Sequence, residues 1–166
     1  MADIYVEMTG IPGNATAKGY ENQIVVDSCQ WGAHNAAPVT GGSASGAQGG
    51  GGKASFSECS MSKQTDKASA PLMLHCATGK HIPTTKISFV SSKNDNTTQL
   101  EMKITLTDCL VSSYSNSGHG GGSQGVAMDM FSLAFAKIEF EHNTFDAKGK
   151  PTPSKAMYDV TSATTG

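Results

Sequence analysis

Two long stretches that alternate between apolar and polar residues constrain the fold of this chain more than any other feature. They span residues 99–117 and 126–142, and a glycine-rich segment, 118–125, separates them. In the first stretch, four apolar side chains fall on one side of the chain: Leu100, Met102, Ile104 and Leu106. A period of two residues predicts a strand with one buried face. We therefore expect an antiparallel hairpin whose apolar face is covered by a second sheet.

Both stretches change phase part-way along. Cys109, Leu110 and Val111 follow one another in the first stretch, so either both faces are covered there or a bulge shifts the alternation. In the second stretch, the apolar positions switch parity near residues 136–137. The residues expected to anchor the core are Trp31, Leu106, Phe131, Leu133 and Phe135.

The remaining elements are shorter. Strand patterns cover residues 4–8, 24–34, 55–63, 86–91 and 155–161. One helix is expected over about 69–78, because Pro71 suits a first turn, Asp66 or Ser69 can cap it, and Gly79 can end it. These elements predict a mainly β fold: a two-sheet β-barrel or sandwich of about eight strands with one flanking α-helix, in a single domain spanning residues 1–166.

The strand pattern at residues 24–34 separates two kinds of side chain. Val25, Cys29 and Trp31 share one parity, and the only tryptophan is expected to point into the core. Ser28 and Gln30 have the opposite parity, so both are expected to face away from the core.

A segment of low complexity covers residues 38–54. Seven of the twelve residues from 41 to 52 are glycine: Gly41, Gly42, Gly46, Gly49, Gly50, Gly51 and Gly52. A glycine-rich segment adds no side chains to a core, and a loop this long is either disordered or an interaction element. Both interpretations stay open on the residues alone. At the C-terminus, residues 162–166 are expected to fray.

Charge and composition argue against several kinds of partner. The chain contains 12 lysines, no arginine and a net charge of −2. Arginine is the preferred residue for phosphate and guanine recognition, so we expect no nucleic-acid partner. The sequence shows neither a signal peptide nor a membrane-length apolar run, so we expect synthesis in the cytoplasm and no membrane insertion. Four cysteines without a CxxC pair are expected to be buried free thiols: Cys29, Cys59, Cys76 and Cys109.

Motifs that resemble catalytic or metal sites lack the context that such sites require. Residues 121–125 match a nucleophile elbow with Ser123 as nucleophile, but a strand-like stretch follows where that motif needs a helix. His75 and His81 have no partner at the spacing of a zinc site. We therefore expect no enzymatic activity, no cofactor and no metal.

Three classes of function remain, in decreasing order of support. The first is a self-assembling structural protein, and the second is a monomeric β-sandwich module that binds a ligand or carbohydrate. Such a module needs clustered exposed aromatic residues, whereas aromatic residues make up 7% of this chain and fall mostly on expected core faces. The third is an enzyme, which needs a nucleophile and a base that the sequence does not bring together.

Several blocks of the sequence carry a resemblance to a known family. One is the string Leu106-Thr-Asp-Cys-Leu-Val-Ser-Ser-Tyr-Ser-Asn-Ser-Gly118, followed by residues 131–139. Others are Trp31-Gly32, residues 66–82 and Tyr158-Asp159-Val160. These blocks resemble the haemolysin-coregulated protein (Hcp) family, whose members are the tube subunits of the bacterial type VI secretion system.

The resemblance implies subunits that close into hexameric rings and stack into a hollow, secreted tube. The implied partners are sheath, spike and baseplate proteins of the apparatus, and small effector proteins in the lumen. Carried over, Ser28 and Gln30 line that lumen, and the seven glycines between 41 and 52 belong to a ring-stacking loop. The protein is then made in the bacterial cytoplasm and secreted through the apparatus. The first loop, residues 10–20, carries less charge than in many members of the family. The resemblance therefore does not identify the cargo.

Overall fold

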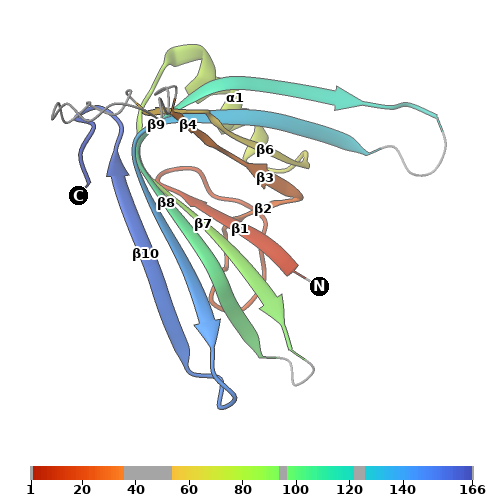
Figure 1. Ribbon diagram of the computed structural model, residues 1–166. Helices are drawn as coiled ribbons and strands as arrows, with labels where there is room; N and C mark the ends of the chain where they lie inside the picture. Colours follow the sequence, from red (N-terminus) through yellow and green to blue (C-terminus); the bar gives the residue numbers. More distant parts are fainter. Residues whose placement is uncertain (1, 36–53, 94–96, 122–125, 166) are drawn as a thin grey trace, which may run out of the picture.

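The computed structural model describes residues 2–35, 54–93, 97–121 and 126–165. Within these ranges it contains ten strands and one helix (Figure 1). In chain order they are β1 (Ala2–Met8), β2 (Ile24–Val26), β3 (Ser28–Gln30), β4 (Ala33–Asn35), β5 (Ala54–Phe56), β6 (Cys59–Gln64), α1 (Ser69–Thr78), β7 (Ile82–Ser92), β8 (Thr98–Gly118), β9 (Ala127–Phe145) and β10 (Pro151–Asp159). The predicted mainly β class and the predicted helix are confirmed. Two predicted strands, 24–34 and 55–63, are each divided, which raises the strand count above eight.

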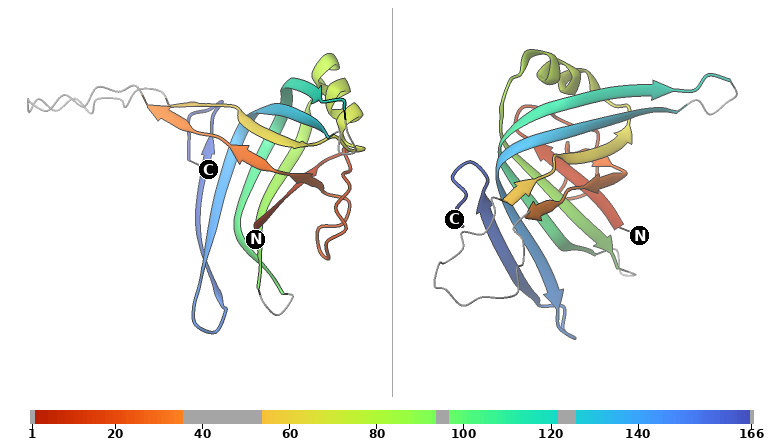
Figure 2. Two further views of the ribbon diagram at one scale, coloured as in Figure 1. Left: turned by 90° about the vertical axis from the view of Figure 1, so that its right-hand side faces the viewer. Right: turned by 45° about the horizontal axis from the view of Figure 1, so that its top comes forward.

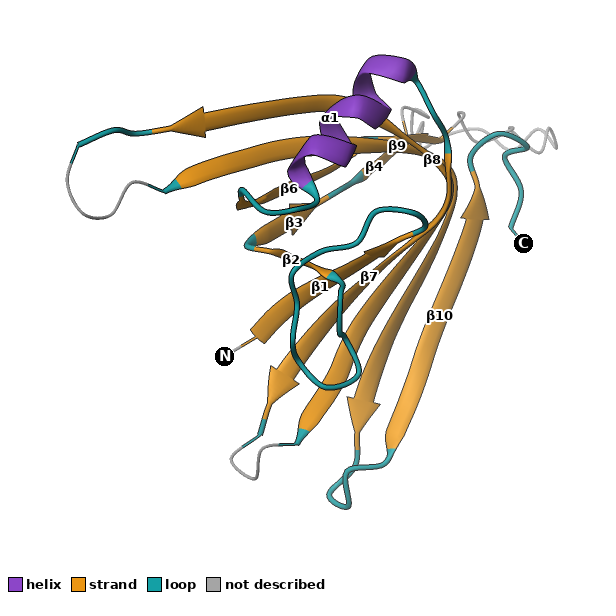
Figure 3. Ribbon diagram, turned by 180° about the vertical axis from the view of Figure 1, so that it is seen from behind, coloured by secondary structure: helices purple, strands orange, loops and turns teal. Residues whose placement is uncertain are grey.

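The hairpin formed by β8 and β9 organises the fold. Its first part lies between two neighbours: β7 pairs with residues 98–109 of β8, and β10 pairs with residues 137–145 of β9. Its second part continues beyond them, where β6 pairs with residues 128–133 of β9. Figure 3 shows both strands bending sharply between these two parts. The hairpin therefore belongs to two parts of the sheet: one with β7 and β10, and one with β6.

The bend coincides with the change of phase that the sequence predicted. Leu106 is buried before the bend, and Cys109 and Val111 are buried after it. Asp108 lies between them with a φ of 53°, in the left-handed region. The ladder to β9 keeps its register at Asp108 and shifts only between Val111 and Ser113. The two strands therefore exchange their buried faces together, and the bulge lies beyond the bend.

The strands form one strongly curved sheet with the order β2-β1-β7-β8-β9-β6-β3, and β10 pairs with β9 beside this path. The two end strands, β2 and β3, are consecutive in the chain, and the N–H of Asp27 between them donates to the carbonyl of Ser62 (2.7 Å). Among the described residues no strand pair closes the sheet into a barrel, because β2 and β3 have only three residues each and do not pair. A separate ribbon, β4–β5, leads away from this sheet (Figure 2), and we call it, together with the linking residues 31–32 and 57–58, the arm.

The five residues expected to anchor the core differ in their burial. Leu106, Phe131 and Leu133 are fully buried. Trp31 and Phe135 are partly buried at the rim of the same cluster. Aromatic rings fill this rim, where the ring of Phe56 lies 6.5 Å from Trp31 and 6.1 Å from Phe135.

The stretch 24–34 is not the single strand that was predicted. Ile24 and Val26 are buried and Val25 is 42% exposed, which is the reverse of the predicted parity for Val25. The prediction failed because the ladder is interrupted at Asp27, so the alternation of β2 does not continue into β3. Beyond this break the predicted parity holds: the side chains of β3 at both ends are exposed and Cys29 between them is partly buried.

Helix α1 begins after Ala68, and no side chain caps it. The two residues predicted as caps bond within the preceding turn instead: Asp66 accepts from the Ala68 N–H (2.8 Å), and Ser69 accepts from the Asp66 N–H (3.0 Å). The helix ends as predicted at Gly79, whose φ of 67° suits a residue without a side chain.

The C-terminal tail folds back across its described residues, and its fraying stays a prediction. The carboxylate of Asp159 accepts hydrogen bonds from the N–H groups of Thr161 (2.9 Å) and Ser162 (3.0 Å). The backbones of Asp159 and Thr164 then bond to each other. The carboxylate of Asp159 therefore accepts hydrogen bonds from the backbone of the turn that follows β10.

Candidate functional site: a hydroxyl-lined sheet face

Two rows of side chains cross four neighbouring strands on the side of the sheet that faces away from the core. The strand registers align the first row across β3, β6, β9 and β8: Ser28, Ser62, Met130 and Ser115. The second row runs beside the first: Gln30, Ser60, Ser132 and Ser113. We call these eight residues the hydroxyl face. They line a hollow of about 290 Å³.

The alternation of each strand builds this face. On β6, Cys59 and Met61 are buried, and on β9, Phe131 and Leu133 are buried. The residues between them must therefore point to the opposite side of the sheet. Their hydroxyl groups pair across the strands, with 2.5 Å between the Oγ atoms of Ser28 and Ser62 and 3.0 Å between those of Ser60 and Ser132.

The chemistry of the hydroxyl face is polar and uncharged. Six of its residues are serines, whose hydroxyl groups can both donate and accept hydrogen bonds, and a glutamine amide can do the same. Met130 adds an exposed, flexible apolar side chain at the centre of the first row, with 62% of its surface accessible. This surface can hydrogen-bond to the polar groups of a bound polypeptide without imposing a fixed charge.

The structure describes two of the residues predicted to form functional surfaces, and the others lie outside its described ranges. Ser28 and Gln30 are exposed and lie in the hydroxyl face, next to six residues that the sequence did not single out. The six were missed because residues of different strands become neighbours only in a particular strand register, which the sequence does not show. The serines at the polar positions of β6, β8 and β9 are a weak indication of such a face. The seven glycines between 41 and 52 lie outside the described residues, so their role stays a prediction.

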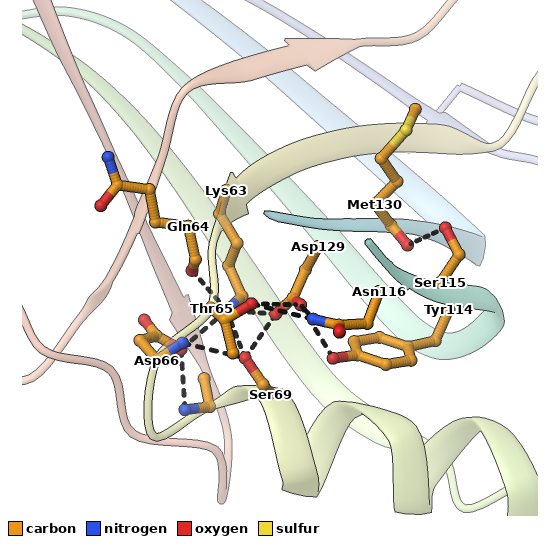
Figure 4. A network of polar contacts seen from close by, with 11 residues as sticks. Lys63, Gln64, Thr65, Asp66, Ser69, Tyr114, Ser115, Asn116, Asp129 and Met130 are labelled. Carbon is orange, nitrogen blue, oxygen red and sulfur yellow. Dashed lines mark hydrogen bonds and ion pairs between the residues drawn. The ribbon is translucent and has the colours of Figure 1, made fainter. Parts of the chain in front are cut away.

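A buried ion pair lies behind one end of the hydroxyl face (Figure 4). Lys63 of β6 and Asp129 of β9 are both fully buried, and their Nζ and Oδ2 atoms are 2.8 Å apart. The ammonium group of Lys63 also donates to Asp66 (2.7 Å) and to the Oγ of Ser69 at the start of α1 (3.0 Å). A buried lysine needs such partners, because an unpaired charge in the interior is strongly destabilising.

Asp129 receives further hydrogen bonds from β8, from the turn after β6 and from α1. The amide of Asn116 (2.6 Å) and the hydroxyl groups of Tyr114 (3.0 Å) and Thr65 (3.0 Å) donate to it, and so does the hydroxyl group of Ser69. Burial acts to raise the pKa of Asp129, but the hydrogen bonds from Lys63 and its other partners outweigh burial and lower that pKa below its usual range. The carboxylate is therefore held in its charged form.

This network supports the hydroxyl face from behind. Lys63 follows Ser62 on β6, and Asp129 precedes Met130 on β9, so the network and the face occupy alternate positions of the same strands. The sequence contains a signal for it that was missed. Lys63 shares its parity with the buried residues of β6, and Asp129 shares its parity with those of β9, so both charges fall on an apolar face.

The two histidines considered as metal ligands have separate partners. The Nδ1 atom of His75 lies 2.8 Å from the carbonyl oxygen of Pro71, within the helix. The Nδ1 atom of His81 lies 2.7 Å from Asp108 at the bend of the hairpin. Across the part of the chain that the structure describes, no three histidine, cysteine or acidic residues form a cluster that could hold a metal ion. Ser123 lies outside that part.

Comparison with protein families gives a match across most of the chain. A family model described as "Type VI secretion system effector, Hcp" matches residues 5–142. The chain belongs to the Hcp family. The family resemblance noted in the sequence is thereby confirmed, and the protein is a type VI secretion system protein.

Individual Hcp proteins and their structures are similar to this chain. Protein Hcp1 of Pseudomonas aeruginosa is 29% identical over 106 residues, which span 64% of this chain and 64% of that protein. A solved structure described as a type six secretion system protein has 25% identity and a TM-score of 0.86, with all of both chains covered. Hcp1 of Salmonella typhimurium has 26% identity and a TM-score of 0.76, with 99% of both chains covered. The described residues therefore share the Hcp fold from the first strand to the last.

No helix within the described residues is long and apolar enough to cross a membrane.

Proposed function

We propose that this Hcp protein is a subunit of the inner tube of a type VI secretion system. In this proposal six copies close into a ring, the rings stack into a hollow tube, and the hydroxyl face turns towards the lumen. Identical subunits joined head to tail form a closed ring when the rotation between them completes a circle. The observation that supports the proposal most is an Hcp family match together with a broad, uncharged face that the core does not use.

The sheet edges of a single subunit also favour assembly. Within the described residues, β10 pairs with no strand other than β9, so its other edge is free in the isolated subunit except at its end, where Asp159 is bridged to Thr164. Pro151 and Pro153 lie in β10 and cannot donate backbone hydrogen bonds, which suits an edge strand. A neighbouring subunit can cover such an edge and prevent uncontrolled strand pairing.

The hydroxyl face is suited to hold cargo weakly. A hydrogen bond exchanged with water contributes only about 0.5–1.5 kcal/mol, so a serine-rich surface binds a passing polypeptide without trapping it. We infer that small effector proteins contact Ser28 and Gln30 in the lumen. The sheath, spike and baseplate proteins are the other proposed partners, and the segment around the glycines at 41–52 is the proposed contact between stacked rings. The protein is made in the bacterial cytoplasm and secreted through the apparatus.

Native mass spectrometry of the purified, untagged protein, combined with negative-stain images of the same sample, tests the assembly. A species of six times the 17.2 kDa subunit mass, with ring-shaped particles, supports the proposal. A monomer that persists at tens of micromolar contradicts it. In that case the chain has the Hcp fold without its proposed assembly, and the alternative of a monomeric ligand-binding module becomes the one to test.

A further inference from the structure

Two cysteines lie next to each other directly behind the hydroxyl face. Cys29 is in β3, between Ser28 and Gln30, and Cys59 begins β6. Their Sγ atoms are 3.5 Å apart, within hydrogen-bonding distance for thiols. Both thiols are free in the structure. The register pairs Cys29 with Met61, so Cys59 is a diagonal neighbour of Cys29, and a disulfide bond of about 2.05 Å needs the two sulfur atoms to approach by about 1.5 Å.

The two thiols differ in accessibility and in acidity. Cys59 is fully buried, whereas Cys29 is partly exposed. The hydrogen bond from Cys59 lowers the pKa of Cys29, and the same bond, together with burial, raises the pKa of Cys59. Because the thiolate is the reactive form, Cys29 is the thiol suited to attack an external oxidant.

The pair lies at the base of the arm that carries the β4–β5 ribbon. The chain leaves β3 just after Cys29, forms the arm, and returns to β6 at Cys59. Among the described residues, β4 and β5 pair with each other and with no other strand. At its base, the N–H of Gly32 donates to Ser57 Oγ (2.7 Å), and the N–H of Ser57 donates to the Gly32 carbonyl (2.9 Å). No covalent bond other than the chain itself holds this base.

We propose that Cys29 and Cys59 are a redox-sensitive pair that forms an intrachain disulfide in an oxidising environment and fixes the base of the β4–β5 arm. This site is separate from the lumen contacts proposed above, and bond formation does not depend on tube assembly. Only its timing rests on the proposed function: thiols persist in the cytoplasm, and the bond forms after secretion into oxidising surroundings.

Oxidised glutathione can act as the oxidant for this reaction. The Cys29 thiolate attacks one sulfur of glutathione disulfide, forms a mixed disulfide and releases one glutathione thiolate. The Cys59 thiol then loses its proton and attacks the Cys29 sulfur, which releases the second glutathione. The two cysteine sulfurs together lose two electrons, the two glutathione sulfurs gain them, and the two thiol protons end on the glutathiones.

Differential alkylation of the whole protein tests the pair. The protein is treated with oxidised glutathione, quenched with acid, denatured, alkylated with N-ethylmaleimide and digested with trypsin. Cleavage after lysine places Cys29 in residues 19–53 and Cys59 in residues 54–63, while Cys76 and Cys109 fall in two other peptides. We expect the first two peptides to be linked and the other two cysteines to be alkylated. Four alkylated cysteines, or a stable glutathione adduct on Cys29, would overturn the proposal.

Two variants separate the bond from general effects of cysteine replacement. Cys29→Ser removes the accessible partner, and Cys76→Ser is a matched control at another partly exposed cysteine. We expect oxidation to raise the Tm of the wild type and of Cys76→Ser by several degrees, because the bond constrains residues 29–59 in the unfolded chain. The Tm of Cys29→Ser should not respond to the oxidant. A Tm that is unchanged by oxidation in the wild type, despite a linked peptide, would show that the bond strains the folded base of the arm and does not fix it in the observed geometry, which would overturn that part of the proposal.

Discussion

At the scale of single residues, Lys63 occupies an environment that is costly for a charged side chain. Its ammonium group is fully buried and contacts two carboxylates, at Asp66 and Asp129, and the hydroxyl of Ser69. Replacing one member of a buried ion pair leaves the other charge without compensation. The network therefore specifies how α1, β6, β8 and β9 fit together.

Replacing Lys63 with methionine should destabilise the fold strongly. We expect Lys63→Met to lower the free energy of unfolding by about 3–5 kcal/mol, because Asp129 stays buried without its cation. The double variant Lys63→Met/Asp129→Asn should recover part of this loss. Urea unfolding followed by Trp31 fluorescence, at one fixed protein concentration, measures both. A double variant less stable than the single one would show that the unpaired charge is not the cause.

The lowered pKa of Asp129 predicts a specific response to acid. An aspartate in an unfolded chain has a pKa of about 3.9. Because the folded-state pKa of Asp129 lies below that value, the unfolded chain takes up the proton first as the pH falls. The stabilisation from Asp129 is therefore complete above the unfolded pKa and decreases progressively below it.

Asp129→Asn cannot titrate at this position, so its free energy of unfolding should fall less steeply than that of the wild type between about pH 5 and pH 3. Urea midpoints at several pH values in this range give both slopes. Equal slopes in the two proteins would contradict the linkage of Asp129 protonation to folding.

At the scale of elements, the β8–β9 hairpin shows what local pattern can and cannot predict. Its length, its apolar face and its change of phase were all visible in the sequence, because each is a property of neighbouring residues. The division of 24–34 into β2, β3 and β4 was not visible. Asp27 interrupts a pattern that otherwise alternates regularly, and its N–H bonds to Ser62 of a distant strand. Contacts between distant segments decided the outcome there.

Asp108 at the bend should tolerate substitution selectively. A β-branched residue is poorly suited to its φ of 53°, so we expect Asp108→Val to lower the free energy of unfolding by about 1–2 kcal/mol. Asp108→Asn should be nearly neutral, since asparagine adopts the left-handed region more readily and can still bond to His81. Urea denaturation compares the two variants. Similar losses in both would contradict a backbone origin of the effect, because asparagine tolerates this φ.

At the scale of the whole molecule, the hydroxyl face depends on strands brought together from separate parts of the chain. Ser28 and Gln30 were identified in advance only through the family resemblance and their parity. Ser60, Ser113 and Ser132 join Gln30 only when β3, β6, β9 and β8 pair in the observed register. No local pattern specifies that register, so the sequence predicted two members of the face and not its extent.

A charge placed on the hydroxyl face should disturb cargo and leave the fold intact. We expect Gln30→Lys to keep the far-ultraviolet circular dichroism and the ring mass of the wild type. The added ammonium group loses hydration beneath a bound protein, so retention of a co-purifying small effector protein should fall roughly tenfold. Ala147→Lys adds the same charge in the turn between β9 and β10 and is the matched control. Unchanged retention by Gln30→Lys would show that Gln30 is not a cargo contact.

The exchange of buried faces at the bend has a consequence for how this hairpin can change in length. Inserting one residue before or after the bend reverses which side chains of that part point inward, and it also displaces the partner strand. Adding two residues to each strand keeps every side chain on its side of the sheet. Adding residues in the connecting turn does so as well, whatever their number. Natural length variants of this protein should therefore differ by even steps within the paired region, unless a bulge such as the one between Val111 and Ser113 absorbs an odd residue, and by any number at the tip.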